Sequence, residues 1–479
     1  MKRRMALLLL VVMLLSLCAC GGQSGKYGDL VEELASAAPS VEATGMAQSE
    51  EPRRTLTLAF RGYNSLWYPL VNHAKAYMAE HPDVVIEVEL FDYGEYTREE
   101  FNSEMSVRLM AGEGPDLLGW WPDVKMLQSG QFLDLYPYME NDPDFHEEDY
   151  YMDILTGLEV EGELTALTMD FSFPNCYAMR SDLEPELAEW FETAESVTYA
   201  DMINLYETLT PQVEGLMPYK TFLPTDALLY YADVAMDVEN QKCSFMIPEL
   251  ADLLERSWGF PTVGVTVAPE GGTKYSTAGG SEVYQRLVDP EGRVLFRWGA
   301  VSTNTGDLFD DEGKVFTMPR LIRTAGGQNL YSAYECLSIT RTCEDPELAW
   351  DFIRFCIKDK EKPYDHLEYW ENNGSYAWSV ATFCPVNRDN NARLLRLQAE
   401  EYYYSAASIG QLKHVGNREK ALNDAVKYAL ALVDQLDACE TLYGAGDTWP
   451  EQYLFLTGET TAEEFLAAVQ NKVNLYIKE

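Results

Sequence analysis

Large apolar residues alternate with other residues along positions 54–60 and 86–90, which predicts two half-buried strands. After each of these segments, apolar residues recur every three or four positions, along 66–77 and 101–109, which predicts two amphipathic helices. The short apolar segment 117–118 predicts a third strand. The order strand, helix, strand, helix, strand is typical of a parallel sheet with helices on its faces.

An aromatic pair follows this third strand within residues 111–134, which read AGEGPDLLGWWPDVKMLQSGQFLD. Ligands of α/β sheets bind beyond the carboxyl ends of the strands, so the side chains that follow the strand would border a crevice. These side chains are Trp120, Trp121 and Asp123. The alternative is that both tryptophans are core residues. We assign Asp116, in the turn before the strand, to local structure as a cap or an Asx-type turn.

The N-terminus has the pattern of an export signal. Three basic residues precede an apolar run at 5–15, which is short for a membrane span. The run ends in LCACG, which resembles a bacterial lipobox and implies that residues 1–19 are a lipoprotein signal peptide and that Cys20 carries the lipid. The alternative is an uncleaved anchor helix. Residues 20–53 are rich in Gly, Ser, Ala and Glu, which predicts a flexible tether.

Composition limits the size, the partners and the redox chemistry of the protein. The 479 residues, 47% of them hydrophobic, exceed the usual size of a single core, so two lobes or domains are expected. Without residues 1–19 the chain has 33 basic and 78 acidic side chains, a formal charge of −45, which argues against nucleic acid and anionic lipid as partners. Seven cysteines follow residue 20, an odd number without C-x-x-C spacing, so most are expected to be buried free thiols.

Five segments of the chain, in this order, resemble the extracellular solute-binding proteins of ABC importers, the maltose-binding-like or family 1 group. They are the opening β-α-β-α-β pattern with its Ala-Gly-x-Gly-Pro-Asp turn, GELTALTMDFSFPNCYAMRSDL at 162–183, CSFMIPELADLL at 243–254, YECLSITRTCEDPELAWDFIRF at 334–355, and AEEFLAAVQNKVNLY at 462–476. The resemblance extends from about residue 55 to the end of the sequence.

This resemblance implies an α/β fold of the type II periplasmic-binding-protein kind. It has two lobes, each a mixed sheet flanked by helices, with a hinge between them. Lobe 1 would comprise residues 55–168 and 338–400, and lobe 2 residues 169–333 and 401–479. The extended, apolar and aromatic runs at 170–174 and 334–339 are the candidate hinge strands. In a hinge of this kind, a few crossing segments absorb the dihedral change while each lobe stays rigid.

The resemblance also implies where a ligand binds. Aromatic rings stack on the C–H faces of sugars, while carboxylates and amides bind the hydroxyls. Three candidates follow the Gly-Pro-Asp strand, two lie in the loop after the first strand, one is at the crossover, and one, equally compatible with a core position, is in the second lobe. The candidate ligand-binding residues are Tyr63, Asn64, Trp120, Trp121, Asp123, Asp170 and Trp298.

One segment departs from the family pattern. Where the family has Leu-Tyr-Ala-Leu-Pro, this chain has Leu-Thr-Ala-Leu-Thr at 164–168, and Met-Arg-Ser-Asp-Leu at 179–183 replaces Tyr-Asn-Lys-Asp-Leu. The missing tyrosine and proline would lie beside the expected pocket. They therefore bear on the class of ligand more than on the fold.

Two other classes of function compete with a binding protein. A secreted lipoprotein glycoside hydrolase would place two carboxylates across a groove, but among 78 acidic residues such a pair can always be chosen. The chain has no G-x-S-x-G, H-E-x-x-H, phosphate-loop or G-x-G-x-x-G motif, and no two of its five histidines are four residues apart. A surface adhesin that takes no part in transport needs no pocket at all.

The sequence therefore predicts a monomeric, lipid-anchored protein on the outer side of the cell membrane, extracellular or periplasmic. It would capture a small polar ligand, a mono- or oligosaccharide, by hinge closure and deliver it to an ABC permease. We expect no catalysis, no metal and no cofactor.

Overall fold

The computed structural model describes many segments of the chain between residues 53 and 476. They are 53–62, 69–92, 95–122, 124–173, 176–216, 218, 224–237, 240–258, 260, 265–267, 273–275, 294–298, 309–310, 313–314, 316–358, 384–396, 418–436, 438–439 and 449–476. The chain divides into two compact units, Met1–Gly119 with Thr342–Cys356, and Trp120–Arg341 with Ile357–Glu479. The lobe boundaries given above stay a prediction.

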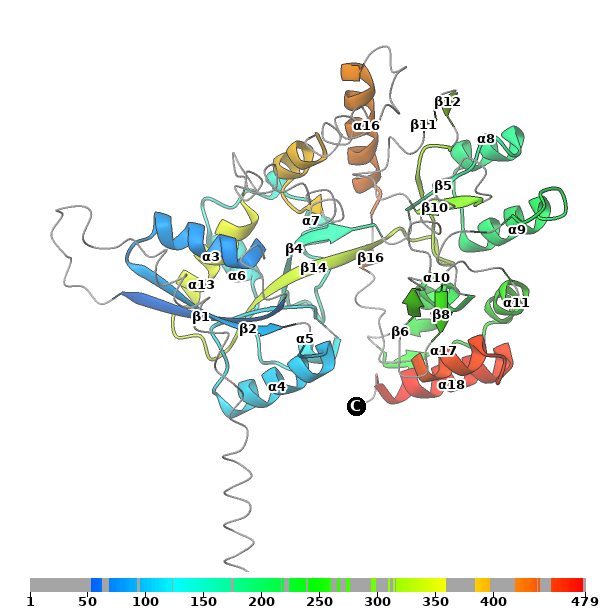
Figure 1. The fold of residues 1–479 in the computed structure, drawn as a ribbon. Helices are drawn as coiled ribbons and strands as arrows, with labels where there is room; N and C mark the ends of the chain where they lie inside the picture. The colour runs from blue at the N-terminus through cyan, green and yellow to red at the C-terminus, as the bar shows by residue number, and fades with distance from the viewer. Residues whose placement is uncertain are drawn as a thin grey trace, which may run out of the picture. The chain divides into compact units, whose positions relative to one another are not determined.

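The first unit contains the parallel sheet that the hydrophobic pattern predicts. Strand β1 (Arg54–Gly62) pairs in parallel with β2 (Val84–Asp92) on one side and with β3 (Leu117–Trp120) on the other. Helix α3 (Pro69–Glu80) connects β1 to β2, and α4 (Arg98–Ala111) connects β2 to β3. The two crossovers run in opposite directions along the sheet, so right-handed connections place α3 and α4 on opposite faces (Figure 1).

Local chemistry determines where these helices begin and end. The Thr97 hydroxyl accepts a hydrogen bond from the Glu100 amide, and the Glu100 carboxylate accepts one from the Thr97 amide, which forms a capping box at the start of α4. The same helix ends at Gly112, whose φ of 75° is a conformation that glycine adopts without strain. In the core of this unit, Tyr77 of α3 packs edge-on against Phe352 and Phe355 of α13 (Pro346–Ile357).

The second unit contains an antiparallel group of strands built on β4 (Leu167–Ser172). β4 pairs with β14 (Leu330–Ile339) and with β15 (Cys384–Pro385), while β16 (Ala438–Cys439) runs parallel to the beginning of β14. Figure 1 shows β4 and β14 side by side. The runs at 170–174 and 334–339, predicted to be extended, thus lie largely in two paired strands that are more than 150 residues apart in sequence.

A smaller sheet lies elsewhere in the second unit, with β5 (Cys176–Met179) between β10 (Phe296–Trp298) and β13 (Arg320–Leu321). Three short pairings complete the described strands: β6 (Met236–Asp237) with β7 (Lys242–Cys243), β8 (Val265–Val267) with β9 (Thr273–Tyr275), and β11 (Phe309–Asp310) with β12 (Gly313–Lys314). The described helices of this unit are α5 (Val124–Leu127), α6 (Tyr136–Asn141), η1 (Glu147–Asp149), α7 (Met152–Leu155), α8 (Pro185–Thr193), α9 (Tyr199–Leu209), η2 (Pro224–Asp226), α10 (Ala227–Ala235), α11 (Pro248–Ser257), α16 (Arg418–Val433), α17 (Trp449–Leu456) and α18 (Ala462–Tyr476).

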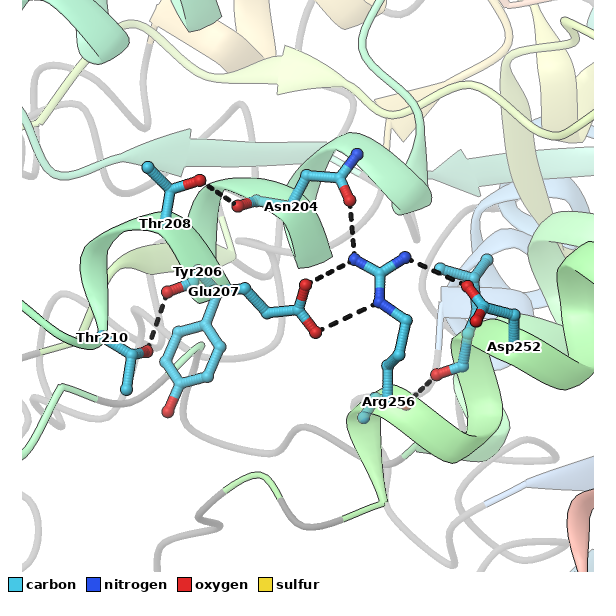
Figure 2. A network of polar contacts seen from close by, with 9 residues as sticks. Asn204, Tyr206, Glu207, Thr208, Thr210, Asp252 and Arg256 are labelled. Carbon is cyan, nitrogen blue, oxygen red and sulfur yellow. Dashed lines mark hydrogen bonds and ion pairs between the residues drawn. The ribbon is translucent and has the colours of Figure 1, made fainter.

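A large apolar core joins α9, α10 and α11 to α18. On the outside of this core, an arginine links two of the helices (Figure 2). The Arg256 guanidinium of α11 donates to both carboxylate oxygens of Glu207 on α9, at 2.6 and 3.1 Å, and to the Asn204 amide oxygen at 2.7 Å. It also donates to Asp252, one turn earlier on its own helix, at 3.2 Å.

The six cysteines whose side chains are described are free thiols, and four of them are buried: Cys176, Cys336, Cys356 and Cys384. Burial raises the pKa of the Cys176 and Cys384 thiols, so both stay protonated and unreactive at neutral pH. The expectation of buried free thiols is confirmed for these four. Among the described residues, no helix is both long enough and apolar enough to cross a membrane.

Candidate functional site

Trp120, the last residue of β3, is packed into the protein interior. Its side chain is 4% exposed, and its ring stacks against Phe132 with 5.2 Å between the ring centroids. The indole Nε1–H donates a hydrogen bond of 2.9 Å to the Ser338 hydroxyl, in the last part of β14. Both the apolar surface and the polar group of Trp120 therefore have partners inside the second unit.

Trp121 is in a different environment although it is the next residue. Its side chain is 36% exposed, and it is among the large hydrophobic side chains that reach solvent. Successive side chains of an extended chain point to opposite sides. The burial of Trp120 therefore directs the Trp121 ring away from the core, at the point where β3 ends.

Asp170 lies in the middle of β4, with strands on both sides. It pairs with Tyr334 of β14 and with Pro385 of β15, and it is half-buried. The Thr168 hydroxyl donates to the Asp170 backbone carbonyl at 2.6 Å. After burial, the charge of Asp170 is the second cause that raises the pKa of the Cys384 thiol.

Strand β14 contacts two of the predicted ligand-binding residues, Trp120 and Asp170. Trp120 binds Ser338 on this strand, and Asp170 is paired with Tyr334, four residues earlier on the same strand. Nothing in the sequence marked Ser338, because a lone serine in an apolar strand carries no periodic signal.

The fourth described candidate is Trp298, in β10, whose backbone pairs with Tyr177 of β5. On its other side, Tyr177 pairs with Arg320 of β13. The Tyr177 side chain is buried, and its hydrogen bond to Tyr230 is one of the lesser causes, after burial, that raise the pKa of the Tyr230 hydroxyl. Tyr177 and Arg320 therefore lie beside Trp298 on neighbouring strands of the small sheet. The sequence did not mark these two residues, because only the pairing of the strands brings them next to Trp298.

The remaining candidates, Tyr63, Asn64, Asp123 and the lipidation residue Cys20, lie outside the described residues. Asp116 has the local structural role expected of it. Its carboxylate accepts from both the amide and the hydroxyl of Thr57 in β1, each at 2.7 Å, and from the Glu344 amide at 3.3 Å. Within the described part of the chain, no group of three or more His, Cys, Asp or Glu side chains is arranged to hold a metal ion.

Solved structures of similar fold include solute-binding proteins. An extracellular solute-binding protein family 1 member from Alicyclobacillus acidocaldarius matches with a TM-score of 0.51 at 14% identity, covering 90% of this chain and 100% of that one. A periplasmic oligogalacturonide binding protein from Yersinia enterocolitica matches with 0.52 at 13%, covering 88% and 99%. An ABC substrate-binding protein from Listeria monocytogenes, solved with cycloalternan, matches with 0.50 at 15%, covering 89% and 99%.

No protein-family model matches the chain, and no curated protein matches it. The structural matches extend over nearly the whole of each solved protein, so the chain has the two-lobe α/β fold of the extracellular solute-binding proteins. Most of these similar structures are binding proteins, whereas two are designed esterases on the same fold. The fold therefore defines the class of structure, and the function must be argued from the site.

Proposed function

We propose that this chain is the lipid-anchored substrate-binding component of an ABC importer and that it captures a mono- or oligosaccharide. The observation that carries the proposal is the pair at the end of β3, where Trp120 is buried and the next residue, Trp121, has a partly exposed ring. A partly exposed aromatic ring offers a flat apolar face on which the C–H face of a sugar can stack.

Charge and polar groups support the choice of ligand. Without residues 1–19 the chain has a formal charge of −45, which disfavours anionic ligands and is compatible with uncharged solutes such as sugars. Asp170 supplies a carboxylate that can accept hydrogen bonds from sugar hydroxyls, and Asp123 would supply a second beside the ring. Tyr63, Asn64 and Trp298 complete the proposed set. Contacts that form only in the closed state would shift the open–closed equilibrium, and a membrane permease would recognise the closed form.

A thermal-shift screen tests the proposal. The chain without residues 1–20 is heated with sugars, oligosaccharides, peptides and polyamines, because a ligand that binds only the folded state raises the melting temperature. At a concentration of 100 Kd the added stability is about 2.7 kcal/mol. A shift confined to one group of sugars is the expected result. A shift with peptides or polyamines alone would contradict the proposal that the ligand is a sugar, but it would still support the function of a binding protein.

Two tryptophan variants localise the site. Trp121→Ala should weaken binding of the active sugar about tenfold or more, because aromatic anchors carry most of the energy of such contacts. Trp190→Ala is the matched control, since this ring is 41% exposed on α8 and no part of the proposed site. Equal affinity in the Trp121 variant would place the ligand elsewhere. Turnover of a labelled glycan would instead establish a hydrolase. If the protein neither binds nor turns over any of these compounds, the surface adhesin is the better interpretation.

A further inference from the structure

Two half-buried arginines of the second unit, Arg320 and Arg323, form no ion pair with any described carboxylate. Other arginines of the described segments do form ion pairs, and these are Arg54, Arg108, Arg180, Arg256, Arg354 and Arg388. The chain has 78 acidic and 36 basic side chains, so carboxylate partners are abundant in its sequence. Two neighbouring guanidinium groups without such a partner therefore stand out in this protein.

Arg320 is held in place by a backbone carbonyl. It lies in β13, where it pairs with Tyr177 of β5. Its Nη1–H donates to the Phe191 carbonyl, in the last turn of α8, at 2.9 Å. A guanidinium carries five N–H donors in a fixed plane, and this bond uses one of them. The bond orients the group, but a carbonyl has only a partial charge and does not neutralise it.

Arg323, three residues further along the chain, is held in the same way. Its amide donates to the Val197 carbonyl at 2.8 Å, and its backbone bridges to Thr198, the N-cap of α9. Its Nη1–H donates to the Gly327 carbonyl at 2.9 Å. The nearby Asp201 carboxylate accepts from the Thr198 amide and hydroxyl in the capping box of α9. Both guanidinium groups are thus oriented by carbonyls.

The surroundings of Arg320 disfavour its positive charge. Burial lowers the pKa of this guanidinium and the charge of Arg323 lowers it further, whereas Tyr428 and Glu192 act in the opposite direction. Glu192, on α8, is the weakest of these influences. A charge that is partly removed from water is costly unless a group of opposite sign lies close to it. An anion bound from solution is such a group.

We propose that Arg320 and Arg323 form a binding site for an oxyanion, either the carboxylate of an acidic sugar or free phosphate. Guanidinium groups bind both through paired N–H donors, and the donors that the Phe191 and Gly327 carbonyls do not use can serve this purpose. The negative charge of the whole chain does not exclude the site, because salt screens charges beyond about 8 Å, whereas a guanidinium acts at contact. The site does not depend on the proposed function.

Thermal melting of the full chain tests the site. Phosphate, glucuronate and glucose are compared at one ionic strength, set with sodium chloride. We expect at least one of the two anions to raise the melting temperature by about 2 °C or more, and Arg320→Gln and Arg323→Gln to abolish the rise. Arg341→Gln is the matched control and should keep the rise, because Arg341 is exposed and also donates to a carbonyl, that of Gly130.

The pattern of shifts identifies the source of the anion. A shift with glucuronate but not with phosphate identifies an acidic sugar, a shift with phosphate alone identifies the free anion, and equal shifts show that the oxyanion group is recognised by itself. No shift with either anion would overturn the proposal. A glucuronate shift that persists in both arginine variants would also overturn it and would leave the proposed sugar site standing.

Chemical modification locates the anion without any substitution. Phenylglyoxal reacts with accessible guanidinium groups, and mass spectrometry of peptides measures the reaction at each arginine separately. The stabilising anion should slow the modification of Arg320 and Arg323 about threefold or more, because only the unoccupied site reacts, and should leave Arg341 unchanged. Equal slowing at all three arginines, or none at Arg320, would contradict the assignment.

Discussion

The Trp120 indole has its hydrogen-bonding partner inside the protein. Its N–H group and the Ser338 hydroxyl are both buried, and the bond between them joins residues 218 positions apart. In such a place the net gain from the hydrogen bond is small, whereas an unpaired donor costs the full penalty of desolvation. Ser338 therefore helps to position Trp120, the residue that directly precedes Trp121.

Removal of this acceptor should destabilise the protein. We predict that Ser338→Ala lowers the free energy of unfolding by about 1–3 kcal/mol, because the Trp120 N–H remains buried without an acceptor. In combination with Trp120→Phe, which has no N–H, the loss should be clearly smaller than the sum of the two single losses. Urea unfolding of the four proteins measures this coupling. Losses that simply add would mean that the bond contributes nothing.

A second residue-scale prediction concerns acid stability in the first unit. Burial opposes the ionisation of Asp351, but hydrogen bonds from the Tyr77 hydroxyl at 2.6 Å and from Arg354 at 2.5 Å outweigh it and lower the pKa of this carboxyl. A pKa below that of the unfolded chain means stabilisation that is present above the unfolded value, about 3.9, and is lost as the pH falls through the folded value.

Asp351→Asn should remove this acid-sensitive contribution. The variant should be less stable than the wild type at pH 7, and its stability should fall less steeply below about pH 4. Chemical denaturation at a series of pH values measures both effects. Asp149→Asn, at an exposed carboxylate of η1, is the matched control for the loss of one carboxylate. Parallel pH profiles for Asp351→Asn and the wild type would contradict the assignment.

At the scale of secondary-structure elements, short-range signals explain most of the helices and long-range pairing explains the strands. The segments 243–254, 334–355 and 462–476 contain, in order, the beginning of α11, the end of β14 followed by α13, and α18. These segments were identified by their resemblance to the solute-binding proteins, whereas hydrophobic periodicity predicted α3 and α4. The six short strands β6 to β9, β11 and β12 were not predicted, because two or three residues are too few to establish a period.

The contact between α9 and α11 allows an element-scale prediction. Exposed ion pairs contribute about 0.2–1 kcal/mol each, and Arg256 makes two, with 28% of its side chain exposed. Arg256→Met keeps the apolar stem and should lower the free energy of unfolding by about 1 kcal/mol, less so at high salt. Arg108→Met, which removes a single pair with Glu89, should have a smaller effect. Equal losses at low and high salt would show that packing dominates.

At the scale of the whole molecule, the proposed function needs a membrane anchor that the described residues do not include. The prediction that Cys20 carries a lipid follows from the lipobox-like sequence. Cys20→Ser should release the protein from the membrane fraction and abolish incorporation of labelled palmitate. Cys18→Ser, two residues earlier, is the matched control and should remain attached. If the Cys20 variant stays in the membrane, the uncleaved anchor helix is the better interpretation.

The sequence by itself determined the parallel opening of the fold, with helices α3 and α4, and the free state of the buried thiols. These features depend on periodicity and composition, which are local properties of the chain. Only the tertiary structure decided that β4 pairs with β14, that Trp120 is buried while Trp121 is exposed, and that Glu335 is left-handed within a strand. Each of these depends on residues far apart in the chain, such as Trp120 and Ser338, and no local pattern records such a contact.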